Sequence, residues 1–190
     1  MTQSEKQVFY RYILNSKYYL EFGMGGSSIA VLMKAKAQIS CVESSPEWIN
    51  KLRKYSIIKT AEKNSRLKIK FVDIGEISNK GFPVDLTKRN NFPKYSSEIF
   101  NEINPSKVDG VLIDGRFRVA CILQTILYCN QKEGLIIMIH DIWTRPHYHT
   151  VLKYLHEIER IDSLGIFRIR DVINLENVKV EYGHYKFDPR

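Results

Sequence analysis

Five residues that can carry charge or transfer a proton follow two apolar segments of the chain. The segments are Val108–Ile113 and Leu135–Ile139, and the residues after them are Asp114, Arg116, Arg118, His140 and Asp141. A histidine or a carboxylate can accept a hydroxyl proton, and a guanidinium can bind an anionic group through two parallel hydrogen bonds. Such apolar runs are typical of central parallel strands, whose carboxyl ends face the ligand in open α/β sheets. We therefore predict a catalytic role for these five residues, although Asp114 would also suit a helix cap and Arg118 a surface charge.

A glycine-rich turn in the segment YYLEFGMGGSSIAVL separates a strand-like run from a helix-like run. It contains three glycines and two serines: Gly23, Gly25, Gly26, Ser27 and Ser28. Glycines let a ligand approach the main chain, and either serine can cap the helix, whose first N–H groups point outward. Glu43 ends the next strand, at the position where an acid accepts hydrogen bonds from ribose hydroxyls. The pattern predicts a site for an adenosine-containing cofactor.

Two features of the turn favour S-adenosylmethionine (SAM) over a dinucleotide. Ser28 replaces the third glycine of G-x-G-x-x-G, and Glu21 would lie poorly beside a pyrophosphate. SAM has no phosphate and carries positive charge, which a nearby carboxylate stabilises. The segment EFGMGGSS resembles motif I of the class I SAM-dependent methyltransferases, and the similarity extends over most of the chain. It implies a SAM site formed by Glu21, Gly23, Met24, Gly25, Gly26, Ser27, Ser28, Glu43, Asp73 and Asp114.

A narrower resemblance lies in VLIDGRFRVACIL, the His140-Asp141 pair and the loop GFPVDLTKRNNFPKY. These segments are similar to a small family of methyltransferase-like proteins with an IDGRFR signature. No established substrate comes with that similarity. What it implies is the fold and a SAM-dependent activity.

The resemblance leaves open whether a metal takes part. Metal-dependent catechol-type O-methyltransferases place magnesium ligands at the positions of Asp114 and Asp141, but their amide ligand is Ile142 here and their lysine base is missing. A metal-free reaction with His140 or Asp141 as the base, and with Arg116 or Arg118 on an anionic substrate, is therefore favoured over a magnesium site. The N/D-P-P-Y/F motif of base N-methylating enzymes is replaced by IDGR, which favours O-methylation of a small-molecule or sugar-like acceptor.

The order of strand-like and helix-like segments predicts a single domain over 1–190. The fold class is α/β: a Rossmann-like, doubly wound, mostly parallel seven-stranded sheet in three α/β/α layers. The predicted strands are Tyr18–Phe22, Gln38–Glu43, Leu67–Val72, Val108–Ile113, Leu135–Ile139, Ile166–Val172 and Val178–Phe187. The predicted helices are Ser4–Leu14, one over Ile29–Met33, Trp48–Leu52 opened by Ser45-Pro46-Glu47, Val119–Leu127 and Val151–Ile158. The aperiodic segment 75–95 follows the third strand and is interpreted as a substrate-side lid.

Composition and charge allow a few further expectations. The 190 residues are 44% apolar, with no run of about 20 apolar residues and no apolar leader, so we expect a cytoplasmic protein without a membrane partner. The net charge is +8, and eight basic residues cluster between Lys51 and Lys70. Such a face leaves an RNA-directed methyltransferase as an alternative, and a non-catalytic methyltransferase-like module as another. A homodimer is possible on these data, and the three cysteines are expected to be buried thiols.

Overall fold

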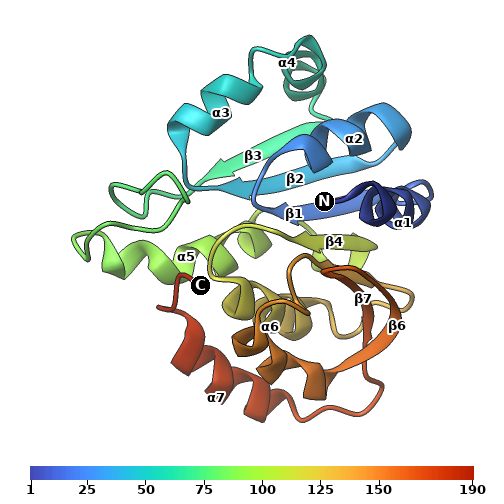
Figure 1. The fold of residues 1–190 in the computed structure, drawn as a ribbon, viewed down its shortest axis with the longest axis vertical. Coiled ribbons are helices and arrows are strands. Elements are labelled where there is room, and N and C mark those ends of the chain that lie inside the picture. Colours follow the sequence, from blue (N-terminus) through green and yellow to red (C-terminus); the bar gives the residue numbers. More distant parts are fainter.

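A computed structural model, which describes residues 1–190, contains one seven-stranded sheet with the strand order β3-β2-β1-β4-β5-β7-β6 (Figure 1). The strands are β1 (Tyr18–Phe22), β2 (Gln38–Glu43), β3 (Leu67–Phe71), β4 (Gly110–Ile113), β5 (Ile136–Ile139), β6 (Leu155–Ile161) and β7 (Leu164–Ile169). The first five pair in parallel, whereas β7 runs antiparallel to both β5 and β6. The order reverses between β1 and β4, the point where ligands bind in such sheets.

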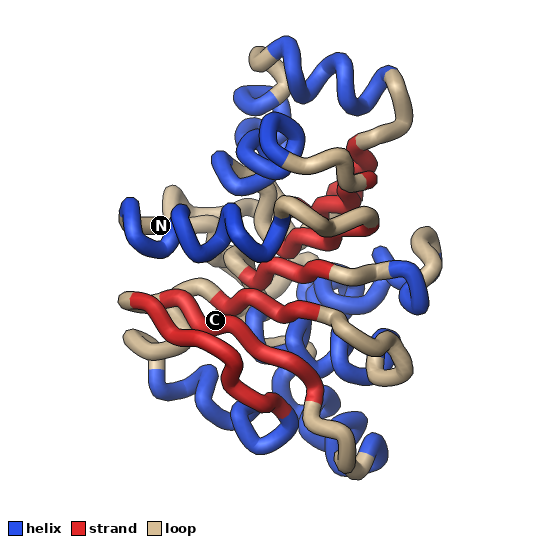
Figure 2. The backbone as a smooth tube through the Cα atoms, turned by 90° about the vertical axis from the view of Figure 1, so that its right-hand side faces the viewer, coloured by secondary structure: helices blue, strands red, loops and turns tan.

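Helices cover both faces of this sheet (Figure 2). The α-helices are α1 (Gln3–Ile13), α2 (Gly26–Lys34), α3 (Pro46–Leu52), α4 (Ser56–Lys63), α5 (Phe92–Ser97), α6 (Arg118–Cys129) and α7 (Leu175–Tyr185). The 3-10 helices are η1 (Arg89–Asn91), η2 (Glu98–Asn101), η3 (Pro105–Lys107) and η4 (Pro146–Tyr154). None of the helices combines the length and the apolar character that crossing a membrane would need. The predicted three-layer α/β/α class with a mostly parallel seven-stranded sheet is confirmed.

The alternation of side chains along the strands divides the core into two clusters. In β4, Val111 and Ile113 pack with α5, α6 and α7, whereas Leu112 packs on the side of α1, α2 and α4. In β5, Met138 lies on the same side as Leu112. Because both faces are buried, these central strands carry no polar residue within them, which is why they read as continuous apolar runs. All three cysteines are buried and free, as expected.

Two predictions near the carboxyl end of the chain are wrong. The predicted strand Val178–Phe187 is the helix α7, which begins where Asn174 accepts hydrogen bonds from two backbone N–H groups. Its apolar and polar residues alternate locally, yet Val178 and Glu181 are buried at helical spacing. The predicted helix Val151–Ile158 ends at Tyr154, and the residues after it form β6. A hairpin with β7, closed by Asp162 and Ser163, stabilises this strand, and the helical spacing of its apolar residues did not show that pairing.

The segment 75–95 is more ordered than its composition indicates. Ile77 and Pro83 form an antiparallel bridge, and Val84 N–H donates to the Glu76 carbonyl at 2.9 Å. We call residues 77–83 the hairpin. Gly81, at its tip, has φ +77°, a left-handed conformation that favours glycine. The rest of the segment ends in η1 and the start of α5.

Candidate functional site

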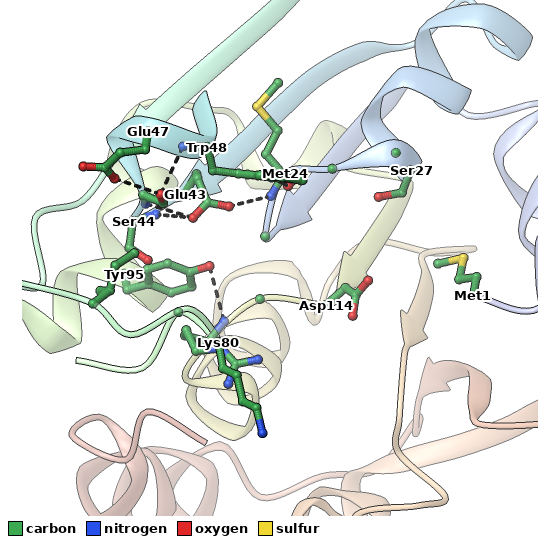
Figure 3. A pocket seen from close by; sticks show the side chains of 18 of the residues that line it. Met1, Met24, Ser27, Glu43, Ser44, Glu47, Trp48, Lys80, Tyr95 and Asp114 are labelled. Atoms are coloured by element: carbon green, nitrogen blue, oxygen red, sulfur yellow. Dashed lines mark hydrogen bonds between the residues drawn. The ribbon is translucent and has the colours of Figure 1, made fainter. Parts of the chain in front are cut away.

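A cavity of about 810 Å³ opens at the carboxyl ends of β1, β2 and β4 (Figure 3). Its volume lies within the usual range for small-molecule sites, roughly 300–1,000 Å³. The predicted site residues that line it are Gly23, Met24, Gly25, Gly26, Ser27, Glu43, Asp114 and Arg116. Those that do not line it are Glu21, Ser28, Asp73, Arg118, His140 and Asp141.

The floor of the cavity is formed where the turns after β1 and β4 touch. Gly23 has φ +95°, and a Cβ atom built on it would lie 2.5 Å from the Cα of Gly115. A Cβ on Gly115 would in turn lie 2.8 Å from the Gly23 nitrogen. Neither position has room for a side chain, so both glycines are required by the backbone itself.

The next two glycines serve a different purpose. At Gly25 the backbone is extended, with φ −170°, and a Cβ atom would meet only Ser27 Oγ, at 4.0 Å. At Gly26 nothing lies within 4 Å. Both residues line the cavity. The missing side chains therefore leave space beside the main chain that a ligand can fill.

Glu21 is fully buried beneath the turn. Its carboxyl group accepts hydrogen bonds from the hydroxyls of Ser27 and Ser28, the second at 3.0 Å. Ser28 Oγ also accepts the Gly25 N–H at 3.1 Å, the hydrogen bond that the third helical residue makes to the N-cap in a capping box, so Ser28 helps to cap α2. Burial raises the pKa of Glu21 to about 8, although the two serine hydrogen bonds act in the opposite direction. Glu21 is thus placed to hold the turn in shape, and it is largely neutral at pH 7.

Glu43 is fixed at the cavity wall by three backbone N–H groups. Its Oε1 accepts from Ser44 and Ser45 at 2.7 and 3.0 Å, and its Oε2 accepts from Met24 at 3.1 Å. Burial raises its pKa, and these hydrogen bonds oppose the rise. Since a carboxylate offers about four acceptor positions, one remains on Oε2 for a hydroxyl of a ligand.

Further wall residues come from elements that carry no motif. Trp48 of α3 lines the cavity, and its Nε1–H donates to the Met24 carbonyl at 2.7 Å. Lys6, Phe9 and Tyr10 of α1 and Ile77–Gly81 of the hairpin also line it. The only sequence signal for these residues was the position of segment 75–95 after the third strand, and α1 gave none.

Asp114 joins the cavity to a network of charges in which Arg118 is buried and Asp114, His140 and Asp141 are half-buried. His140 Nδ1 lies 2.9 Å from Asp114 Oδ1, and Arg118 bridges Asp114 and Asp141 at 3.2 and 3.3 Å. Burial alone would lower the pKa of His140, but the hydrogen bond and charge of Asp114 and the charge of Asp141 raise it. Asp141 also pairs with Arg145 at 2.8 Å. Only Asp114 of this network reaches the cavity.

A divalent metal does not fit this network well. Asp114, His140 and Asp141 bring donor atoms within 4.8 Å of one another, a spacing that a metal site would need. However, the Arg118 guanidinium already occupies both carboxylates, and it is only 3% exposed. A hard cation such as magnesium would have to displace that buried charge before it could bind.

Arg116 lines the cavity, whereas Asp73 does not. The Arg116 side chain stacks on Phe82 of the hairpin, with 4.2 Å between its Cζ and the ring centroid. Asp73 is 45% exposed and pairs with Lys88 at 3.2 Å. It stands outside the cavity, so in this conformation it does not contact what the cavity holds.

Three of the eight basic residues between Lys51 and Lys70 form ion pairs within the chain. Lys68 and Lys70 pair with Glu102, each at 2.7 Å, and Arg53 pairs with Glu62 at 2.7 Å. Arg66 donates to the carbonyls of Ala35 and Ala37. This pairing reduces the charge available to an RNA backbone on that face.

No protein-family model matches the chain, and no curated protein matches it. Among solved structures, a methyltransferase-like protein from Silicibacter pomeroyi has a TM-score of 0.82 and 23% identity, over 100% of this chain and 96% of the other. A methyltransferase from Podospora anserina bound to S-adenosylhomocysteine (SAH) has a TM-score of 0.55 and 15% identity, over 90% of this chain and 80% of that one. An O-methyltransferase from Bacillus cereus in complex with SAH has a TM-score of 0.55 and 11% identity, over 90% and 82%. These similarities show a shared fold.

Proposed function

We propose that this protein is a SAM-dependent methyltransferase acting on oxygen in a small-molecule or sugar-like acceptor. The observation that carries the proposal is that the glycine turn and Glu43 line the same cavity and are joined by the hydrogen bond from Met24 N–H to Glu43. The turn exposes main chain, and Glu43 keeps one acceptor position free beside it. Neighbours with the same fold include methyltransferases that bind SAH, which supports this choice of cofactor.

The residues around the cavity suit the parts of SAM. Glu43 would accept a hydrogen bond from a ribose hydroxyl, and the space beside Gly25 and Gly26 would take the adjoining chain. When bound, SAM supplies a methyl group activated by a sulfonium. Glu21 would act indirectly, through the two serines that it holds.

Asp114 is the residue we propose to receive the acceptor's proton, because it is the only acid of the charge network that lines the cavity. His140 would hold Asp114 in place through the 2.9 Å contact. Arg118 and Asp141 would position both residues from behind. Aligning a hydroxyl between Asp114 and the methyl donor would supply much of the rate, since a displacement depends on positioning.

The hairpin and α1 would cover the bound ligands. Both contribute residues to the cavity wall, although they lie about 70 residues apart in the sequence. Segment 75–95 would thus act as the lid predicted from sequence, with its tip at Ser78–Gly81 doing the covering.

Calorimetry with SAM and SAH tests the proposal. We expect both to bind the wild-type protein, and Gly25→Val to weaken binding by more than about tenfold because its side chain would project into the cavity. Gly183→Val in α7 is the control, since nothing lies within 4 Å of its Cβ position and it is remote from the cavity. If neither SAM nor SAH binds the wild type, the proposal is wrong and a non-catalytic module becomes the better reading.

A further inference from the structure

The charged residues of the cavity differ in whether the protein itself pairs them. All three carboxylates have partners: Glu43 has backbone N–H groups, Glu47 has Ser45, and Asp114 has Arg118 and His140. The three cationic side chains, Lys6, Lys80 and Arg116, form no ion pair with any residue of the chain. No carboxylate of the chain thus lies within ion-pair distance of these three cations, although the charge of Arg116 still opposes the rise in the pKa of Glu43 that burial causes.

Arg116 is the member of this set with a buried nitrogen that has no hydrogen-bond partner. Lys6 and Lys80 are exposed, whereas Nη1 of Arg116 is buried and has no hydrogen-bond partner. A buried donor without a partner destabilises the folded protein, and the cost is greater when the donor is charged. Burial, together with the charge of Arg118, lowers the pKa of Arg116, as expected of a guanidinium short of counter-charge.

The surroundings of Arg116 hold it ready for an anion with two acceptor oxygens. Phe82 lies against the Arg116 guanidinium. The backbone N–H of Arg116 is 3.4 Å from the Tyr95 hydroxyl oxygen. Gly81, at the tip of the hairpin, lies beside the same side chain, with its Cβ position 3.9 Å from Arg116 Cδ. A stacked guanidinium that loses little freedom on binding is suited to a carboxylate or a phosphate, which accept two parallel hydrogen bonds.

We propose that the methyl acceptor carries an anionic group, a carboxylate or a phosphate, and that Arg116 binds it with help from Lys80. The statement that the bound molecule is a methyl acceptor rests on the proposed function. The anion site itself rests on the Arg116 guanidinium, which has no ion-pair partner in the chain.

The cofactor's own carboxylate is the main competitor for Arg116. Figure 3 shows Lys80 on the other side of the pocket from Ser27, the last residue of the glycine turn that lines it. A cofactor whose ribose meets Glu43 and whose chain follows the turn toward Ser27 would carry its carboxylate away from Lys80. The Arg116 side of the cavity is then left for the second ligand.

The test measures anion binding to the protein saturated with SAH. Inorganic phosphate and acetate are titrated separately at constant ionic strength, and the melting temperature is followed. For the wild type we expect a saturable rise, and for Arg116→Gln a dissociation constant weaker by more than about tenfold. Arg116→Lys should recover part of the affinity because it keeps the charge but not the fork. Arg170→Gln, at an exposed arginine outside the cavity, is the matched control.

Each outcome decides a different point. Stronger binding of phosphate than of acetate would identify a phosphorylated acceptor, and the reverse a carboxylate. Unchanged anion binding in Arg116→Gln would overturn the proposal. So would a comparable loss of SAH affinity in that variant, since Arg116 would then hold the cofactor. If the wild type binds phosphate but not SAH, the anion site survives while the proposed function fails.

Discussion

The Nδ1 atom of His140 lies 2.9 Å from Oδ1 of Asp114, directly behind the one acid of the charge network that reaches the cavity. The other ring nitrogen, Nε2, is 3.4 Å from Glu5 of α1. His140 therefore connects the proposed proton acceptor with a helix that forms part of the cavity wall. The protonation state of His140 therefore affects both Asp114 and the contact with α1.

The raised pKa of His140 makes its contribution to stability depend on pH. The folded protein favours the protonated ring, so this contribution is complete below the ordinary pKa of 6.5 and is lost as the pH rises through the folded value. The difference in unfolding free energy between the wild type and His140→Gln should thus shrink as the pH rises above the ordinary pKa of 6.5. Urea unfolding of both proteins on either side of that pKa measures it. A constant difference would show that the imidazolium is not stabilised by Asp114.

Glu21 should also destabilise the fold as the pH rises, but here because folding favours the uncharged form of the side chain. Its folded pKa is about 8 against an ordinary 4.5, so folding favours the neutral acid. The stability from Glu21 is complete below pH 4.5 and is lost as the pH rises toward 8, reaching a loss of roughly 3 kcal/mol at pH 7. Glu21→Gln cannot ionise, and it should gain on the wild type over this interval. Parallel pH profiles of the two unfolding free energies would contradict the assignment.

Replacement of Arg118 should be among the most damaging changes in the protein. The side chain is 3% exposed and pairs with Asp114 and Asp141. Arg118→Met would leave two partly buried carboxylates without it, at a cost of about 3–5 kcal/mol in unfolding free energy. Arg145→Met, which removes a 36% exposed partner of Asp141, should cost less than about 1 kcal/mol. Equal losses from the two variants, measured by denaturant unfolding, would be inconsistent with Arg118 as the central bridge.

Chelation should leave the protein unaffected. Because Arg118 occupies both candidate ligands, neither EDTA nor millimolar magnesium is expected to change the melting temperature, SAH affinity or methyl transfer to an acceptor. Comparing the wild type with and without each additive checks this. A magnesium-dependent rise in melting temperature that disappears in Asp141→Asn would show that the ion displaces the arginine.

Local pattern was sufficient for the parts of the site that lie within one strand, turn and helix. The glycine turn and Glu43 were recognisable because each backbone requirement falls on neighbouring residues. The directions in which the Asp114 and Asp141 side chains point could not be predicted in this way. Asp141 has φ +62°, and it turns into the network with Arg118 and Arg145, whereas Asp114 faces the cavity. That difference depends on contacts between separate strands and helices, which no single window of sequence contains.

The walls of the cavity were harder still to predict. The position of α1 depends on Glu5, which accepts hydrogen bonds from Ser163 across almost the whole length of the chain. The same limit explains the error at α7: the alternation in its sequence fits a strand, and only packing against α6 selects the helix. Pattern predicted the layers well and the long-range neighbours poorly.

The contact between Gly23 and Gly115 also bears on how this chamber could be re-engineered. Because there is no space for even one methyl group between the two turns, Gly23 and Gly115 cannot be replaced by larger residues. The hairpin and α1 reach the same chamber through side chains, including Lys80 and Lys6, and these can be exchanged. Libraries that aim to broaden or redirect ligand choice should therefore vary α1 and the hairpin and leave the two turns constant.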